Sequence, residues 1–207
     1  MDVSNGLSVV TPTLEAWVLR AIVQTTRPLS GRQVARLVEQ GSLGGVQKAL
    51  SRLVKQGIVL ADAHPSATFF TLNRDHLAAR PVIELAQLAT TLVQRLTSFI
   101  QSWEVQPQHA CLFGSAARQD GDTSSDVDIL LVHSQSWQEP SRAWAQQVDD
   151  LAAKIWLWTG NDAGILDISS VDLDRMQVNK EAILNSWQRD GILLAGQELP
   201  QPRVAPR

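Results

Sequence analysis

Two apolar runs, separated by a glycine-serine turn and a polar loop, constrain this sequence most tightly. The runs 109–113 and 126–132 have the length and composition of strands, and Gly114-Ser115 interrupts the chain after the first. Asp126 and Asp128 open the second run. Residues two apart on a β-strand point to the same face, so these carboxylates are expected side by side. The pattern predicts two strands with a turn and an acidic pair at one edge.

An acidic pair next to a glycine-serine turn indicates a particular chemistry. Two close carboxylates repel each other unless a cation lies between them. Mg²⁺ accepts one or two carboxylates together with substrate phosphates. The turn can supply backbone N–H groups and a serine hydroxyl for phosphate. Together these features predict phosphoryl or nucleotidyl transfer.

Gly114-Ser115, ten intervening residues and Asp126-Val127-Asp128 resemble the signature of the polymerase-β-like nucleotidyltransferase superfamily. The nearest resemblance is to its small bacterial branch, the minimal nucleotidyltransferases. Arg118 matches the basic residue that often follows the glycine-serine pair. Gln119 departs from the pattern, because the family usually has glycine there.

The resemblance implies an α/β (α+β) nucleotidyltransferase domain with a mixed sheet and flanking helices. It also implies two Mg²⁺ ions and a nucleoside triphosphate substrate, with ATP expected. Asp167 lies in the strand expected over 165–169, and the resemblance assigns it the third metal-binding carboxylate and proton acceptor. An aspartate inside an apolar strand is costly unless it is paired or metal-bound. The implied nucleotide-binding residues are Gly114, Ser115 and Arg118, and the implied catalytic and metal-binding residues are Asp126, Asp128 and Asp167.

Charge is distributed unevenly along the chain. Residues 1–80 carry nine Lys and Arg against five Asp and Glu, whereas residues 81–207 carry nine against sixteen. Such asymmetry suggests a module that faces nucleic acid joined to a different domain. We expect a first domain at 11–75, a linker with a long helix at 76–108, the transferase-like domain at 109–199 and a flexible tail at 200–207.

The first domain shows three short helical repeats followed by two β-like runs. This order resembles the winged helix-turn-helix domain of bacterial transcription regulators, whose third helix enters the DNA major groove. The wing, however, offers no Lys or Arg for phosphate, and winged helices also dock proteins. The residues expected to face DNA are Lys48, Ser51, Arg52 and Lys55.

The remaining sequence features set the broader limits. No apolar run reaches the length of a membrane span, and the N-terminus lacks a signal-peptide pattern, so we expect a cytoplasmic protein without membrane partners. The single cysteine, Cys111, is expected to be a small buried side chain.

The sequence leaves open whether the acceptor of the nucleotide is a small molecule, a protein or an RNA. A second subunit, such as a homodimer partner, could complete the pocket. Two other interpretations stay open: a DNA-binding regulator with a nucleotide-sensing domain, and an antitoxin-like partner that modifies a cognate protein.

Overall fold

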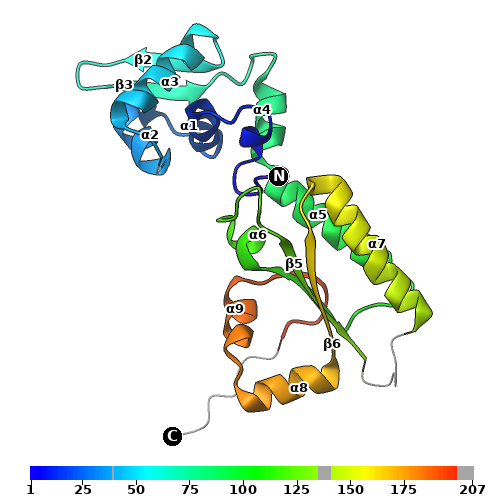
Figure 1. Ribbon diagram of the computed structural model, residues 1–207. Helices are drawn as coiled ribbons and strands as arrows, with labels where there is room; N and C mark the ends of the chain where they lie inside the picture. Colours follow the sequence, from blue (N-terminus) through cyan, green and yellow to red (C-terminus); the bar gives the residue numbers. More distant parts are fainter. Residues whose placement is uncertain (39, 135–140, 200–207) are drawn as a thin grey trace, which may run out of the picture. The chain divides into compact units, whose positions relative to one another are not determined.

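The computed structural model describes residues 1–38, 40–134 and 141–199. The chain divides into two compact units, one of Asp2 with Ser4–Ala89, the other of Met1, Val3 and the chain from Thr90 onward (Figure 1). The tail expected at 200–207 falls outside the described residues. Among the helices of the described ranges, none combines the length and hydropathy that a bilayer-crossing segment needs.

In its described residues the N-terminal unit contains a short 3-10 helix, four α-helices and a small antiparallel sheet in the order β1-β3-β2. Its core consists of helix residues such as Val18, Val34 and Leu50, which are all 1% exposed or less. The predicted three helices and hairpin are therefore present, while the winged-helix assignment stays a prediction. Leu7 is also buried in this core, so the unit begins before residue 11. Its elements are η1 (Gly6–Val9), α1 (Leu14–Val23), β1 (Leu29–Ser30), α2 (Gly31–Val38), α3 (Leu43–Lys55), β2 (Val59–Ala63), β3 (Thr68–Leu72) and α4 (Ala79–Ala86).

The expected long linker helix is two helices. α4 ends at Ala86, and α5 (Leu88–Gln101) begins after Gln87. The apolar residues of α4 pack on the N-terminal core, whereas Leu92, Leu96 and Ile100 of α5 are buried residues of the second unit. One helical repeat in the sequence thus serves two cores. Pro81 lies in the first turn of α4, where proline is tolerated.

The second unit is a mixed α/β domain built on a four-stranded sheet in the order β6-β5-β4-β7. β4 pairs antiparallel with β5 and β7, whereas β5 pairs parallel with β6. The strand-turn-strand unit predicted around the glycine-serine motif forms the centre of this sheet. After α5 the elements are β4 (His109–Phe113), α6 (Gly114–Arg118), β5 (Val127–His133), α7 (Arg142–Thr159), β6 (Ala163–Ser169), α8 (Ser170–Asn179), α9 (Ala182–Asp190) and β7 (Ile192–Gly196).

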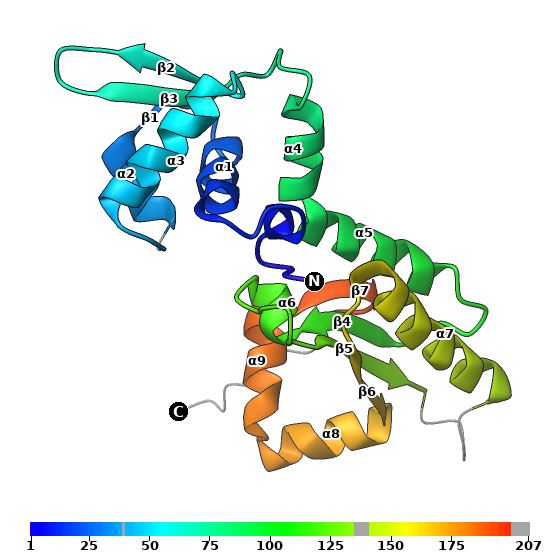
Figure 2. The same cartoon turned by 45° about the horizontal axis from the view of Figure 1, so that its top comes forward.

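The two faces of this sheet carry different residues. Paired residues on neighbouring strands point to the same side, so the register places Asp128, Leu130 and Cys111 on one face. The buried Leu173, Leu184 and Trp187 of α8 and α9 pack on that face. The other face is covered by α5 and α7 (Figure 2). We call the first the α9 face and the second the α7 face.

Sequence reasoning missed α8. Its only buried side chain is Leu173, so the segment lacks the apolar repeat that marks a helix. Asp172 lies in the first turn of α8, and its backbone N–H donates to Ser169 Oγ at 3.1 Å. A serine followed three residues later by an acidic residue is a helix-start signal that could have revealed it.

Candidate active site

Asp128 lies where three strands meet. It pairs with Phe113 at the end of β4 on one side and with Gly164 near the start of β6 on the other. Asp126 precedes β5 by one residue. The structure therefore brings the acidic pair next to the turn that follows β4, as the spacing of the motif predicts.

Two glycines enclose the Asp128 carboxylate. Gly114 has φ +68°, and a Cβ built on it would lie 2.1 Å from Asp128 Oδ2. A Cβ on Gly164 would lie 2.6 Å from Asp128 Oδ1. Real Cβ atoms do not approach oxygen this closely, so glycine is required at both positions while the carboxylate keeps its place. Gly114 also needs glycine for its positive φ.

The environment disfavours the charged form of Asp128. Burial raises the pKa of Asp128, the negative charge of Asp126 raises it further, and the positive charge of Arg118 lowers it. A cation beside the carboxylates favours their charged form and so offsets both raising effects. The site is therefore electrostatically suited to a divalent ion.

The loop between α6 and β5 folds back onto the glycine-serine turn. A Cβ on Gly121 would lie 2.7 Å from Ser115 Oγ, so the loop backbone passes directly over this serine. Arg118 Nε donates to Asp120 Oδ2 at 2.9 Å, which leaves its side chain 41% exposed. Asp122 Oδ1 accepts from the Ser124 backbone N–H at 2.8 Å and so makes a turn.

Gln119 ends α6 in the left-handed region, at φ 57°. A residue with a Cβ is destabilised by about 1–2 kcal/mol in this region of backbone space. Glycine avoids this strain but loses more conformational entropy on folding, so its net stabilising effect is smaller. We expect Gln119→Gly to raise the free energy of unfolding by about 0.5–1 kcal/mol, measured by urea denaturation. Lys180→Gly, at φ 54°, is the matched control and should gain as much. A loss of stability in both variants would contradict this account.

The structure does not bring Asp167 to Asp126 and Asp128. Asp128 is level with Gly164, and Asp167 follows three residues later, so its side chain points to the α7 face. There Asp167 Oδ2 accepts a hydrogen bond from Trp144 Nε1 at 2.8 Å. The expected role of Asp167 as third metal ligand and proton acceptor is therefore not supported by its position. Among the described residues, no group of three or more His, Cys, Asp or Glu is placed to hold a metal ion.

Asp167 instead supports a buried indole. Trp144 is fully buried, and Asp167 accepts its N–H. We expect Asp167→Ala to lower the free energy of unfolding by about 1–2 kcal/mol, because a buried donor loses a charged acceptor. Urea denaturation measures this loss. A variant as stable as wild type would contradict the structural role of Asp167.

Two residues that sequence reasoning missed help to shape the site. Gly164 makes room for the Asp128 carboxylate, and a glycine inside a strand is a signal of close approach. Asn161 is 4% exposed, and its side-chain amide donates to the Ser125 carbonyl at 2.8 Å. Asn161 thereby fixes the chain just before Asp126. Nothing in the local sequence distinguishes it from an ordinary loop asparagine.

The residues expected to face DNA are all exposed on α3. Arg52, however, forms an ion pair with Glu15 of α1 within the same unit. The hairpin β2–β3 contributes no Lys or Arg. Lys48, Ser51 and Lys55 are exposed polar side chains on α3, as the predicted DNA-facing surface requires.

Cys111 is 2% exposed, and burial raises the pKa of its thiol to about 12. The thiol therefore stays protonated and packs as a small apolar side chain, as expected.

No protein-family model and no curated protein matches the chain. A solved structure from Sulfolobus solfataricus, described as a "putative nucleotidyltransferase", aligns with 54% of this chain and 86% of its own, at 16% identity and a TM-score of 0.33. A likeness at this level does not establish a common fold.

Proposed function

We propose that the second unit is a Mg²⁺-dependent nucleotidyltransferase that moves a nucleoside monophosphate from a nucleoside triphosphate to an acceptor hydroxyl. One observation carries the proposal: the Asp128 carboxylate sits beside Asp126 and directly against Gly114 of the glycine-serine turn. A strand-borne acidic pair is thus in contact with the turn that can receive phosphate.

Residues of the glycine-serine turn and of α6 would bind and orient the triphosphate. Ser115 and the backbone around Gly114 would receive the phosphate oxygens, and Arg118 would leave Asp120 to add a positive charge. Arg118 already lies near enough to Asp128 to lower the pKa of that carboxyl. Holding the triphosphate and the acceptor in line supplies most of the rate gain in phosphoryl transfer.

Asp126 and Asp128 would hold Mg²⁺, which neutralises the triphosphate and lowers the pKa of the attacking hydroxyl. Two carboxylates with substrate phosphates are an ordinary ligand set for this ion. Two ions, as the resemblance implies, would have to share this pair, because Asp167 lies on the other face of the sheet. ATP is the proposed donor.

The test uses purified protein with Mg²⁺ and each of the four α-labelled nucleoside triphosphates. Host extract supplies acceptors, and an Asp126→Ala/Asp128→Ala protein is the control. Label that moves onto a protein, an RNA or a small molecule only with wild type supports the proposal and identifies the acceptor class. Equal labelling by both proteins would refute it. Triphosphate binding without transfer would favour the nucleotide-sensing regulator, and a labelled cognate protein would favour the antitoxin-like partner.

The exposed polar face of α3 supports DNA binding as a second proposed activity. Lys48 and Lys55 project from it, and each phosphate contact adds about one to the slope of log affinity against log salt. We expect Lys48→Ala/Lys55→Ala to weaken binding to a fluorescent duplex about tenfold and to reduce that slope by about two. Lys154→Ala, an exposed lysine of α7, is the charge-matched control. If the loss of DNA affinity per removed lysine is the same on α3 and on α7, a DNA-binding site on α3 is excluded.

A further inference from the structure

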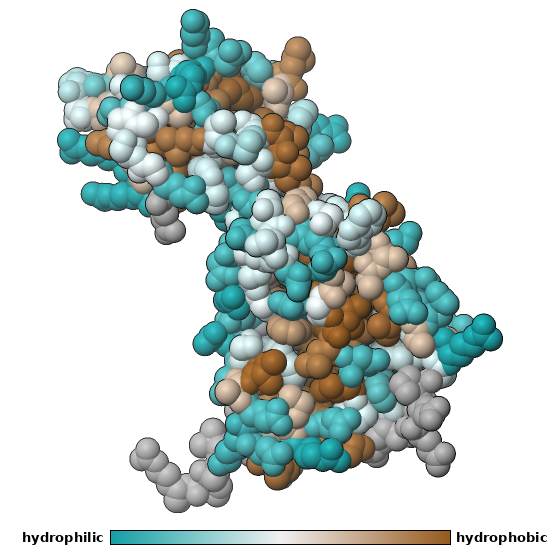
Figure 3. All heavy atoms as spheres, in the orientation of Figure 1, coloured by the Kyte–Doolittle hydropathy of each residue, from teal (hydrophilic) through white to brown (hydrophobic). Residues whose placement is uncertain are grey.

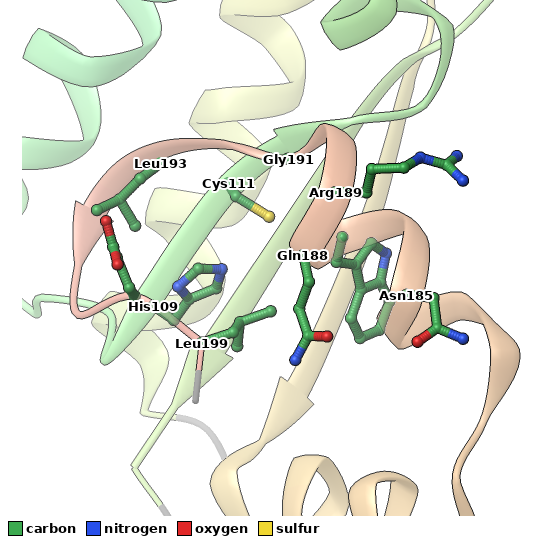
Figure 4. A pocket seen from close by; sticks show the side chains of 10 residues that line it. His109, Cys111, Asn185, Gln188, Arg189, Gly191, Leu193 and Leu199 are labelled. Atoms are coloured by element: carbon green, nitrogen blue, oxygen red, sulfur yellow. The ribbon is translucent and has the colours of Figure 1, made fainter. Parts of the chain in front are cut away.

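The acidic pair lies at an accessible, hydrophilic end of the sheet in the second unit. Asp126 is exposed and Asp128 is half-buried. Hydrophilic side chains lie over α6 and the loop that follows it in Figure 3. A cavity of about 540 Å³ opens elsewhere on the α9 face, where Figure 4 shows His109, Cys111 and Gln188, and neither aspartate lines it. A cation at the acidic pair would therefore be held by the strand ends, in contact with solvent.

The turn of residues 160–162, between α7 and β6, holds this end of β5 from one side. The Val127 backbone N–H donates to the Asp162 carbonyl at 2.9 Å, which continues the parallel ladder of β5 and β6 by one residue. Two residues further along, Gly164 is the glycine against which the Asp128 carboxylate packs. One short segment thus contacts the chain at both aspartates.

Asn161 is the side chain that this turn contributes to the site. It is 4% exposed, and its amide donates to the Ser125 carbonyl at 2.8 Å. A carbonyl can only accept, so this bond also fixes which end of the amide faces the strand. Asn161 therefore holds the residue before Asp126, and the Asp162 carbonyl holds the residue after it, Val127.

Asn161 is itself anchored to the end of α7. Its backbone N–H donates to Thr159 Oγ1 at 3.0 Å, and the Thr159 hydroxyl donates to the Ile155 carbonyl at 2.7 Å. Asn161 Oδ1 also accepts from the Met1 nitrogen. Breaking any of the buried bonds would leave a buried polar group unsatisfied, so this network favours one geometry. Asn161 connects the end of α7 to the start of β5.

We propose that Asn161 is a positioning residue for the cation site, which holds Asp126 where its carboxylate and that of Asp128 bind the same ion. Among the described residues no hydrogen bond or ion pair holds the Asp126 side chain, so its position depends on its backbone. Groups that orient a metal ligand typically change metal affinity about 10–100-fold when they are mutated. The inference rests on the proposed function, which places Mg²⁺ on this pair.

The test measures Mn²⁺ binding to the full-length protein without nucleotide, from the electron paramagnetic resonance signal of free Mn²⁺. We expect Asn161→Ala to weaken Mn²⁺ binding about tenfold. Thr159→Val leaves the Met1 contact in place but removes the acceptor of the Asn161 N–H, and it should weaken binding about threefold. Thr159→Ser keeps the hydroxyl and should bind Mn²⁺ as wild type does.

Trp144→Phe is the control for a general loss of stability. It removes a buried N–H that donates to Asp167 on the α7 face, and it changes nothing at the acidic pair. Its Mn²⁺ affinity should equal that of wild type.

Transfer kinetics provide a second readout. In Asn161→Ala the Mg²⁺ concentration for half-maximal transfer should rise about tenfold, while the rate at saturating Mg²⁺ stays within about threefold of wild type. A mere loss of folded protein would lower the rate at every Mg²⁺ concentration and leave the Mg²⁺ requirement unchanged.

The outcomes separate this inference from the proposed function. Wild-type Mn²⁺ affinity in Asn161→Ala and Thr159→Val, or equal weakening in Trp144→Phe, would refute the role of Asn161 and leave the cation site in place. If Mn²⁺ binds wild type no better than Asp126→Ala/Asp128→Ala, the proposed cation site is wrong, and the role of Asn161 is refuted with it.

Discussion

Asp128→Asn is expected to lower nucleotidyl transfer about 10³-fold while the protein stays folded. The amide keeps the size of the side chain but removes the charge that would hold Mg²⁺, a loss of several kcal/mol in the transition state. The measurement is the initial rate of transfer from α-labelled ATP at saturating Mg²⁺. Asp167→Asn is the matched control, since it changes the same chemical group on the opposite face of the sheet and should keep near wild-type activity.

The same variant should be more stable than wild type without metal. The folded-state pKa of Asp128 is raised, so its contribution to stability is complete at low pH and is lost as pH rises through that pKa. At pH 7 the asparagine protein should therefore unfold at a higher temperature. Added Mg²⁺ should raise the melting temperature of wild type and leave that of Asp128→Asn unchanged. Equal Mg²⁺ shifts in both proteins would place the ion elsewhere.

The central sheet and the acidic pair could be predicted because their signals are local. The apolar run 109–113, the glycine-serine turn and the two aspartates at i and i+2 each specify geometry over a few residues. β4 and β5 pair antiparallel, although their connection, residues 114–126 with α6, is long enough for a parallel crossover as well. The closeness of Gly114 and Asp128 is a direct consequence of that pairing.

The position of Asp167 on the opposite face could not be predicted, for a different reason. Which face Asp167 occupies depends on the register of β6 against β5, and the whole of α7 separates these strands in sequence. A shift of one residue moves every side chain to the opposite face. Extending the observed register aligns Asp162, not Asp167, with Asp126. Sequence alone specified the strand and its alternation but contained no local signal for this register.

The division of one apolar repeat into α4 and α5 could not be predicted for a related reason. Leu85 and Leu92 continue a single helical pattern, yet they pack in different units. The apolar periodicity shows that one face of a helix is buried. It does not show which core that face packs against.

Gly114→Ala is expected to lower both stability and transfer. The positive φ of Gly114 costs an alanine about 1–2 kcal/mol, and the added Cβ cannot coexist with Asp128 Oδ2 at 2.1 Å. The carboxylate must therefore move. A displacement of about 1 Å in a catalytic group can cost about 10²-fold in rate, so transfer should fall by at least that factor. Urea denaturation and initial transfer rates measure the two effects separately.

Two other glycines separate the causes. Gly160→Ala introduces only the backbone strain of a positive φ. Gly160 has φ +72°, and a Cβ there would meet nothing within 4 Å. It should lose about 1–2 kcal/mol of stability and keep wild-type transfer. Gly164→Ala introduces only the steric contact with Asp128. Gly164 has no positive φ, and its Cβ would lie 2.6 Å from Asp128 Oδ1. It should lose transfer about as strongly as Gly114→Ala. If Gly164→Ala transfers nucleotide at the wild-type rate, the position of the Asp128 carboxylate does not control the chemistry, and the proposed site is wrong.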